Sequence, residues 1–402
     1  MIEQTKNHSI IIENIDIGGP TMVRAAAKNY NDVTVITSTD QYSELINELK
    51  KNKGSTSLKF REKMSMLAFS ETAYYDAVIS DYFNKFNNII FPKRKILYTN
   101  LIENLRYGEN PHQLGAFYSH NKKNKLEQIH GKTLSYNNYN DILAAITISK
   151  SFPKNIGTVI VKHGNPCGVS ALKNNLDSYK YALETDPISA FGGIVSCNYK
   201  ITQKLAFMLN KIFLEVIVAD GFDKKALKIL KSKKNVRLID SSKISFSEVW
   251  KFNSLDKFAL MQSEDKKIFS KKDFRIVSKR QPSKSQLSNL MFAFNVCRYT
   301  KSNAIVLASN KSTIGIGSGQ PSRLDSCEIA INKMNKFSKI KNEIVAASDA
   351  FFPFVDGIEK LVQSGASAIV QPAGSIRDKE IIKFANETNT VLVFSKTRHF
   401  RH

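Results

Sequence analysis

Residues 157–168 read GTVIVKHGNPCG, a short apolar and β-branched run that leads into a loop rich in glycine and proline. Such a run predicts a buried strand with a polar loop at its end. Similar units recur along the chain, as SAFGGIVSCN at 189–198, EVIVAD at 215–220, SNAIVLASN at 302–310 and SAIVQPAGS at 367–375. Because helical segments alternate with these strands, the sequence predicts an α/β architecture with largely buried strands and functional groups on the loops at strand ends.

The first 88 residues have a different, largely helical pattern. The β-branched segment VTVIT at 33–37 predicts one strand, and apolar spacing predicts helices over 9–16 and 57–86. Helices are also predicted over 21–30, where Thr21 would cap an Ala-rich segment, and over 40–51. Regular periodicity is lost in NNIIFPKRK at 87–95, which contains a proline and a basic cluster. We therefore expect one domain over 1–88 and a second over 89–402, where the similarity of the strand units suggests an internal duplication.

The composition of the 402 residues excludes a disordered chain, because 42% are hydrophobic and 24% are charged. Lys and Arg number 59 against 36 Asp and Glu, which gives a net charge of +23. This charge permits nucleic-acid binding and favours anionic substrates, but a lysine-rich surface explains it as well. No apolar run reaches the roughly 18 residues of a membrane span. The first residues, MIEQTKNHS, contain no apolar signal region, so we expect a cytoplasmic protein.

Four cysteines bear on metal binding and redox state, namely Cys167, Cys197, Cys297 and Cys327. None belongs to a C-x-x-C pair, which indicates neither a zinc site nor a disulfide framework and fits a reducing compartment. Pro166-Cys167 invites comparison with the zinc deaminase signature P-C-x-x-C. However, Cys167 is followed by Gly, Val and Ser, and no His-x-Glu motif accompanies it. A zinc-activated water is therefore not expected.

Lys162 and His163 end the first strand unit, directly before Gly164, Asn165 and Pro166. Histidine titrates near neutral pH and relays protons, and a neighbouring ammonium group stabilises negative charge that develops on a carbonyl oxygen. A loop histidine that only bonds to backbone is the structural alternative. The strand, the lysine and the polar loop together favour a catalytic pair, exposed at the carboxyl end of the strand.

Several other polar motifs are candidates for binding an anionic or heteroaromatic ligand. GIGSGQPSR at 315–323 combines glycines, whose backbone N–H groups approach anions, with an arginine that clamps carboxylate or phosphate. SDAFFPF at 348–354, together with Asp356, combines aromatic rings for stacking with two carboxylates. The others are LRYG at 105–108 with NPHQ at 110–113, QPAGS at 371–375, the basic tail TRHFRH at 397–402 and the pair Asp16 and Lys28. Each of these motifs also fits a purely structural role, as a turn, a helix cap, a core segment or a solvated tail.

Taken together, these motifs resemble a known family, the bifunctional purine biosynthesis proteins with AICAR transformylase and IMP cyclohydrolase activities. The matching runs are IDIGGPTMVRAAAKN, LRYGENPHQ, VIVKHGNPCG, SAFGGIVS, RYTKSNAIVL, IGIGSGQPSR, ASDAFFPFVDG, VQPAGSIRD and the final TRHFRH. They occur in the family's order, and so many separated motifs make the resemblance specific.

The resemblance implies transfer of a formyl group from 10-formyltetrahydrofolate to the exocyclic amine of AICAR, after which formyl-AICAR closes to IMP with loss of water. It implies a duplicated, cytidine-deaminase-like transformylase domain without zinc over 89–402, and a partial cyclohydrolase domain over 1–88. It also implies a homodimer with shared active sites. The partners would be AICAR and folate, with no nucleic acid, no membrane and no required metal.

The resemblance also implies roles for residues at matching positions. His163 would be the base for the attacking amine, and Lys162 would stabilise charge at the tetrahedral centre. The implied substrate-binding residues are Arg106, Tyr107, Gly192, Glu215, Asn303, Arg323, Phe351, Asp356 and Arg398, of which Asn303 would orient the folate and formyl group. The residues implied to line the folate site are Leu324, Ser375 and Ile376. Asp16 and Lys28 match the reacting residues of the cyclohydrolase domain.

One departure from the family pattern concerns the first domain. The family carries an N-terminal cyclohydrolase lobe that binds the substrate phosphate, whereas this sequence starts shortly before the IDIGG motif. We therefore expect intact formyl transfer and impaired cyclisation, unless a separate chain supplies the lobe. Three alternatives remain. They are a zinc nucleoside deaminase, which would hold stoichiometric zinc, a basic nucleic-acid-binding module with steep salt dependence, and a non-catalytic remnant of the bifunctional protein.

Overall fold

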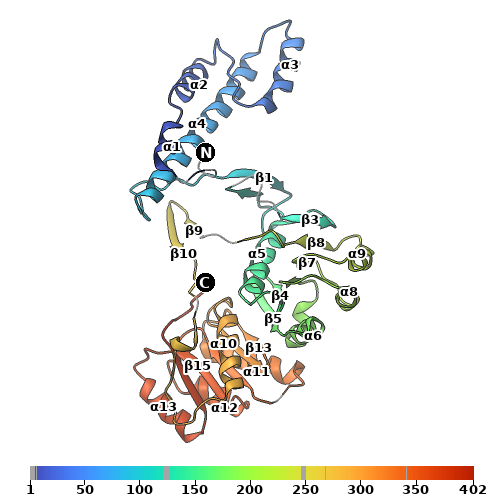
Figure 1. The fold of residues 1–402 in the computed structure, drawn as a ribbon, viewed down its shortest axis with the longest axis vertical. Coiled ribbons are helices and arrows are strands. Elements are labelled where there is room, and N and C mark those ends of the chain that lie inside the picture. The colour runs from blue at the N-terminus through green and yellow to red at the C-terminus, as the bar shows by residue number, and fades with distance from the viewer. Residues whose placement is uncertain (1–4, 6, 121–125, 246–249, 268, 341) are drawn as a thin grey trace. The chain divides into compact units, whose positions relative to one another are not determined.

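The computed structural model describes residues 5, 7–120, 126–245, 250–267, 269–340 and 342–402. The chain divides into two compact units, which we call unit 1 (residues 1–101 and 118–123) and unit 2 (residues 102–117 and 124–402). Figure 1 colours them from blue to red along the chain. The division falls within β1 (Asn100–Leu105) and β2 (Gly115–Ser119), which pair as a two-stranded sheet.

Unit 1 is largely helical, as the sequence predicts. Its elements are α1 (His8–Glu13), α2 (Gly18–Lys28), the 3-10 turn η1 (Thr39–Gln41), α3 (Tyr42–Lys51) and α4 (Leu58–Phe86). The hydroxyl of Ser57 accepts a hydrogen bond from the Phe60 amide and so caps α4. A small core forms where α2 lies against α4, around Ala27, Met64 and Ala68.

The predicted strand VTVIT at 33–37 is wrong, because these residues have no regular secondary structure. β-branched residues favour a strand only where a neighbouring strand completes the hydrogen-bond ladder. Among the described residues, no strand pairs with this segment. The hydroxyl of Thr34 instead bonds to the hydroxyl of Thr56 at 2.7 Å.

Unit 2 is built on one mixed sheet, which confirms the predicted α/β class. Twelve strands of the described residues lie in the order β11-β16-β15-β14-β12-β13-β5-β4-β6-β7-β8-β3. The first half contains β3 (Glu127–His130), β4 (Gly157–Lys162), β5 (Asn165–Ala171), β6 (Ile194–Cys197), β7 (Val216–Ala219) and β8 (Arg237–Asp240). The second half contains β11 (Phe274–Ile276), β12 (Ile305–Ser309), β13 (Ser312–Gly317), β14 (Val345–Ser348), β15 (Ala368–Pro372) and β16 (Val391–Ser395).

The two halves repeat one strand order. In each half an antiparallel hairpin, β4–β5 or β12–β13, is followed outward by three mutually parallel strands. An antiparallel strand, β3 or β11, forms each outer edge. The order therefore reads the same from both ends, and the halves meet where β5 pairs antiparallel with β13.

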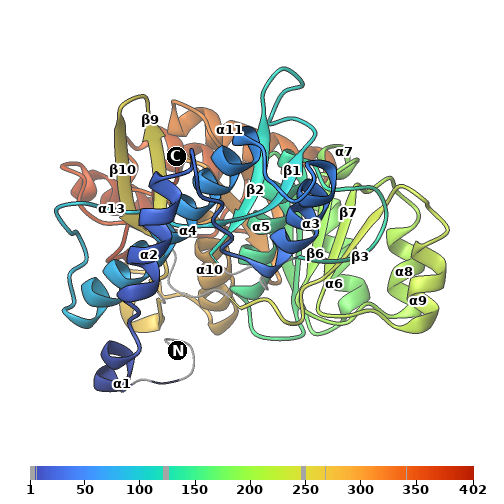
Figure 2. The ribbon, with the colours of Figure 1, turned by 90° about the horizontal axis from the view of Figure 1, so that it is seen from above.

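Helices cover both faces of this sheet (Figures 1 and 2). One face packs against α5 (Tyr136–Lys150) and α10 (Lys284–Cys297). The other face carries α6 (Asn175–Thr185), α8 (Gln203–Leu209) and α9 (Lys224–Leu230) in the first half, and α11 (Arg323–Phe337), α12 (Asp356–Gln363) and α13 (Asp378–Glu387) in the second. A short helix, α7 (Pro187–Ala190), precedes β6. None of the helices in the described part of the chain is long and apolar enough to cross a membrane.

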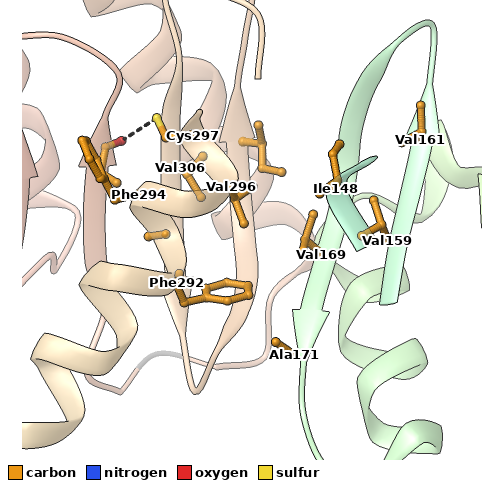
Figure 3. Close-up of a cluster of buried hydrophobic side chains, with 14 of the residues drawn as sticks. Ile148, Val159, Val161, Val169, Ala171, Phe292, Phe294, Val296, Cys297 and Val306 are labelled. Atoms are coloured by element: carbon orange, nitrogen blue, oxygen red, sulfur yellow. Dashed lines mark hydrogen bonds between the residues drawn. The ribbon is translucent and has the colours of Figure 1, made fainter. Parts of the chain in front are cut away.

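The core follows from the alternation of side chains along buried strands. Val159 and Val161 of β4 pack toward α5, whereas Ile160 between them packs on the opposite face with α6. Figure 3 shows the cluster on the α5 and α10 face, in which Val169 of the first half and Phe292 of the second take part. This single cluster spans both halves, so the halves share one core.

Two glycine-containing segments that the sequence predicts as loops belong instead to strands. Asn165–Ala171 forms β5, and Gly315 and Gly317 lie in β13. A Cβ atom at Gly168 or Gly317 would collide with backbone of α6 or α11, at the carbonyl oxygens of Ala182 and Ser326. These glycines therefore allow close helix–strand packing rather than cradling an anion.

The sheet places the ends of its strands in a way that the sequence alone does not show. Because β4 runs antiparallel to β6, the carboxyl end of β4 meets the amino ends of β6, β7 and β8. Since β5 is antiparallel to β13, the same edge carries the start of β12 and the carboxyl ends of β13–β16. We call this border, which strand ends form and not the outer strands β3 and β11, the edge of the sheet. It combines carboxyl ends from one half with amino ends from the other.

Candidate active site

The turn between β4 and β5 presents His163 to solvent. Lys162 pairs with Asn165, so only His163 and Gly164 form the turn. Both have positive φ angles, of 52° and 71°. This is the backbone that a two-residue hairpin turn requires, and histidine is among the residues that tolerate it. The turn therefore projects the imidazole from the sheet edge, where it is exposed.

Lys162 is held at the base of this turn. Its Nζ donates a hydrogen bond to the carbonyl oxygen of Gly192 at 2.8 Å. Gly192 lies just before β6 and itself has a φ of 67°. Glu215 stands beside it at the start of β7, because its amide donates to the Gly193 carbonyl oxygen at 3.1 Å. The register of the sheet thus brings Lys162, Gly192 and Glu215 together.

Glu215 has two neighbours that no sequence motif indicated. Its Oε2 accepts from Asn138 Nδ2 at 2.9 Å and lies 3.9 Å from Arg237 Nη1. The pKa of Arg237 lies below its usual value, mainly because the side chain is buried. The charge of Glu215 opposes this shift, and the charge of Arg106 adds to it. Arg106 itself lies over the Tyr107 ring, with its Cζ 5.5 Å from the ring centroid. This part of the edge is therefore rich in cations.

Arg323 is the centre of a second, buried cluster at the same edge. Its side chain is only 8% exposed, and its guanidinium forms an ion pair with Asp349, which is fully buried. It also donates to the Ser348 hydroxyl at 2.8 Å and to Oδ1 of Asn303 at 2.7 Å. The arginine expected to clamp substrate thus already holds three protein groups.

Asn303 is fixed from both sides of its carboxamide. Its Nδ2 donates to the carbonyl oxygens of Gln320 and Pro321, both at 2.8 Å. Its Oδ1 accepts from Arg323. Backbone carbonyl oxygens of the segment after β13, together with Arg323, therefore position Asn303, and the anion-binding role expected for the GIGSG backbone has no support in this geometry.

A short chain of hydrogen bonds connects the turn to this second cluster. Oδ1 of Asn165 accepts from the Lys301 amide at 3.0 Å. The Lys301 carbonyl oxygen accepts from the Gly319 amide at 2.8 Å. Because Asn165 is two residues after His163 and Lys301 two before Asn303, the Lys162–His163 pair and Asn303 lie near the same edge of the sheet.

The other expected ligand-binding residues lie at strand ends of the second half. Phe351 follows β14 and is half-buried, and Asp356 begins α12 and is exposed. Leu324 is half-buried in the first turn of α11. Ser375 and Ile376 follow β15, and Ile376 is fully exposed. The exposed Arg398 lies near the C terminus, with its Cζ 4.4 Å from the centroid of the Phe400 ring.

Asp16 and Lys28 belong to unit 1 and stand at opposite ends of α2. Asp16 precedes the helix, and its Oδ1 accepts from the Gly19 amide at 3.0 Å. Lys28 lies in the last turn. The rise of an α-helix separates the two ends by roughly 15 Å. No ion pair joins Asp16 to Lys28 among the described residues, so the structure does not bring them together.

The residues described here show no group of three or more His, Cys, Asp or Glu side chains suited to a metal ion. The four cysteines are free and buried. Burial raises the pKa of Cys167, Cys197 and Cys327 to about 12. They therefore behave as small apolar core residues rather than as metal ligands or nucleophiles.

Gly192 provides a direct test of the Lys162 position. In Gly192→Ala, the new Cβ would lie 3.1 Å from Lys162 Nζ and 3.4 Å from the Phe213 ring. We expect kcat for the reaction at this site to fall at least about tenfold, because small displacements of a reacting group are costly. Gly221→Ala is the control, since Gly221 also has positive φ but its Cβ would approach only Lys200. If kcat fell equally in both variants, the loss would come from backbone strain and not from displacement of Lys162.

Comparison with known proteins places the chain in a family. The family described as AICARFT/IMPCHase bienzyme matches residues 26–333. The bifunctional purine biosynthesis protein PurH of Acetivibrio thermocellus is 42% identical, and the match covers 100% of this chain and 79% of that protein. Proteins of the same name from Leptospira biflexa and Persephonella marina are each 44% identical. Those two matches cover 97% and 98% of this chain, and 76% and 77% of the relatives.

A solved structure, dCMP deaminase from the cyanophage S-TIM5, matches 24% of this chain and 91% of its own, at 10% identity and a TM-score of 0.20. So low a score carries no argument about the fold. The family match and the relatives do confirm the resemblance that the sequence motifs indicate. The chain belongs to the AICARFT/IMPCHase bienzyme family, whose members are purine biosynthesis enzymes with transferase and hydrolase activities.

Proposed function

We propose that unit 2 transfers a formyl group from 10-formyltetrahydrofolate to the exocyclic amine of AICAR, at the sheet edge that carries Lys162 and His163. The observation that carries this proposal is the β4–β5 turn. It exposes an imidazole beside a fixed ammonium group and is hydrogen-bonded through Asn165 to the Lys301–Asn303 segment.

In the proposed mechanism the amine nitrogen of AICAR attacks the formyl carbon. His163 takes the proton that the nitrogen loses as the new C–N bond forms. The formyl oxygen becomes an oxyanion, which the Lys162 ammonium stabilises. When the tetrahedral centre collapses, its bond to N10 of the folate breaks, N10 takes up a proton, and formyl-AICAR and tetrahydrofolate leave.

The remaining residues are proposed to bind the two substrates. Arg106, Arg398 and the nearby cationic groups supply charge for the AICAR phosphate. Tyr107, Gly192, Glu215, Phe351 and Asp356 are the further AICAR-binding candidates. Because the Arg323 guanidinium is occupied by Asn303, Ser348 and Asp349, we assign it to holding Asn303 toward the folate and formyl group.

Folate is proposed to bind near Leu324, Ser375 and Ile376. Ile376 offers a fully exposed apolar side chain after β15, and Phe354, half exposed, adds an aromatic ring. The Cζ of Arg377 lies 4.7 Å from the centre of that ring. An apolar and aromatic surface beside a cation suits a flat heterocycle that carries carboxylates.

The finer assignments of fold and domain are proposals as well. We propose that 89–402 is a transformylase domain with a duplicated, cytidine-deaminase-like fold that uses no zinc. The palindromic strand order of the sheet supports a duplication. Residues 1–88 would belong to a cyclohydrolase domain in which Asp16 and Lys28 take part in closing formyl-AICAR to IMP.

Turnover is the decisive test of the proposed function. Purified chain mixed with AICAR and 10-formyltetrahydrofolate should produce formyl-AICAR and tetrahydrofolate in equal amounts, as followed by absorbance and chromatography. Folded protein that forms neither product would contradict the proposal. Zinc remaining bound in stoichiometric amount after dialysis, together with deamination of a nucleoside, would favour the deaminase alternative instead.

We also propose that the protein is a homodimer and that a hairpin of unit 2 contributes to the interface. β9 (Trp250–Leu255) and β10 (Phe258–Ser263) form an isolated antiparallel hairpin. It exposes large apolar side chains, among them Phe258 at 75% and Leu260 at 62%. Side chains of this kind gathered on one element are typical of an association surface.

The hairpin predicts how the mass in solution responds to substitution. Light scattering should give twice the chain mass for the wild type, and a lower average mass for Phe258→Lys with Leu260→Lys, because two charges would be buried at an apolar interface. Ser254→Lys, an exposed polar position of the same hairpin, is the matched control and should stay dimeric. A monomeric wild type would contradict the proposed dimer. A double variant that stayed dimeric would exclude the hairpin from the dimer interface.

A further inference from the structure

The His163 turn has a support on the neighbouring helix. Asp141 lies in the second turn of α5, and its Oδ1 accepts a hydrogen bond from the Gly164 amide at 2.6 Å. Burial raises the pKa of Asp141 above its usual value, although hydrogen bonds from the Gly164 and His163 backbone and the charges of His163 and Lys162 oppose the shift. The carboxylate thus faces the backbone of the turn on which the proposed base stands.

The turn needs such a support because of its backbone. His163 and Gly164 both have positive φ, and only one of them is glycine. A non-glycine residue persists in this conformation when its surroundings hold it there. Without a partner, the Gly164 amide would also lose a hydrogen bond inside a half-buried site.

The second half of the sheet repeats the same arrangement. Its hairpin turn, Asn310 and Lys311, has φ angles of 47° and 51°. The Lys311 amide donates to Oδ1 of Asn289, on α10, at 2.9 Å. Each supporting residue is six positions after the serine that caps its helix, Ser135 for α5 and Ser283 for α10. Both halves thus use a side-chain oxygen at one helix position to hold the second residue of a left-handed turn.

We propose that Asp141 is a positioning residue for formyl transfer, which holds the His163–Gly164 turn so that the imidazole reaches the attacking amine. This inference rests on the proposed function of His163. The internal comparison indicates that the hydrogen-bond acceptor is what the turn requires, because the other half meets the same requirement with a neutral amide. The Asn310–Lys311 turn lies at the opposite edge of the sheet, beside the end of β5, so it provides a built-in control.

Three single variants test the proposal. We expect Asp141→Ala to lower kcat about 10- to 100-fold while KM for AICAR changes less than about threefold, because the base is displaced but the binding groups are not. Asp141→Asn retains the acceptor oxygen and should recover kcat to within about threefold of wild type. Asn289→Ala removes the equivalent support away from His163, so it should lower thermal stability and leave kcat of the folded enzyme nearly unchanged.

Hydrogen–deuterium exchange supplies a readout that is independent of activity. Exchange in a peptide spanning 160–166 should accelerate in Asp141→Ala and remain slow in Asp141→Asn. Wild-type kcat in Asp141→Ala, equal losses of kcat in Asp141→Ala and Asn289→Ala, or no recovery in Asp141→Asn would each overturn the inference. If His163→Asn retained wild-type kcat, the proposed function itself would fail, which is a separate outcome.

Discussion

His163→Asn should lower kcat for formyl transfer roughly 100- to 10 000-fold, which is the usual range for loss of a general base. Asparagine is chosen because it tolerates the left-handed backbone of residue 163 well, where φ is 52°. The imidazole is exposed, so its loss removes no core packing. The variant should therefore keep the thermal stability of the wild type and lose only the group that accepts the proton of the amine.

Single-turnover and steady-state assays with AICAR and 10-formyltetrahydrofolate measure this effect. KM for AICAR should change little, because the proposed binding groups Arg106, Tyr107 and Arg398 remain. His130→Asn is the control, since His130 contacts the Lys233 carbonyl oxygen and lies on the outer strand β3, four strands from β4 in the sheet order. A His163→Asn enzyme with kcat within twofold of wild type would remove His163 from the mechanism.

The sequence predicted the parts of this molecule that depend on local pattern. Short apolar and β-branched runs indicated β4 and β12, and helix-forming composition and apolar spacing indicated α2, α3 and α4. The Lys162–His163 pair could be proposed as a candidate because the chemistry of the two residues and their place after an apolar run can be seen in a few residues of sequence. Local pattern failed for VTVIT, which has strand propensity but no strand beside it, and for Gly168 and Gly317, whose role depends on distant helices.

The arrangement of the candidate site depends on contacts that are far apart in sequence. Asp141 meets Gly164 across 23 residues, and Asn165 meets the Lys301 amide across 136. No spacing rule connects such pairs, because the first depends on the packing of α5 against β4 and the second on the antiparallel junction of β5 with β13. The occupied guanidinium of Arg323 was hidden for the same reason. An arginine in a glycine-rich motif indicates anion binding, but only the fold shows that Asp349 pairs with it.

Arg323→Met should be the most destabilising of the substitutions considered. Removing the guanidinium leaves the Asp349 carboxylate fully buried and without its cation, which costs about 3–5 kcal/mol. The midpoint of thermal unfolding should fall by something on the order of 10 °C. Lys360→Met is the matched control, because Lys360 pairs with Glu328 at 2.6 Å on the surface, where such pairs contribute at most about 1 kcal/mol.

A second substitution separates stability from function at this site. In Arg323→Met with Asp349→Leu no charge remains buried, so much of the lost stability should return, as replacing a buried ion pair by apolar residues is often neutral. Formyl transfer should nevertheless stay low, because Asn303 has lost the donor that fixes its Oδ1. If activity returned together with stability, Arg323 would support formyl transfer only by stabilising the fold. If neither returned, the hydrogen bond that the Ser302 hydroxyl donates to Asp349 would be the interaction whose loss matters. Unfolding midpoints and kcat measured on the same preparations distinguish these outcomes.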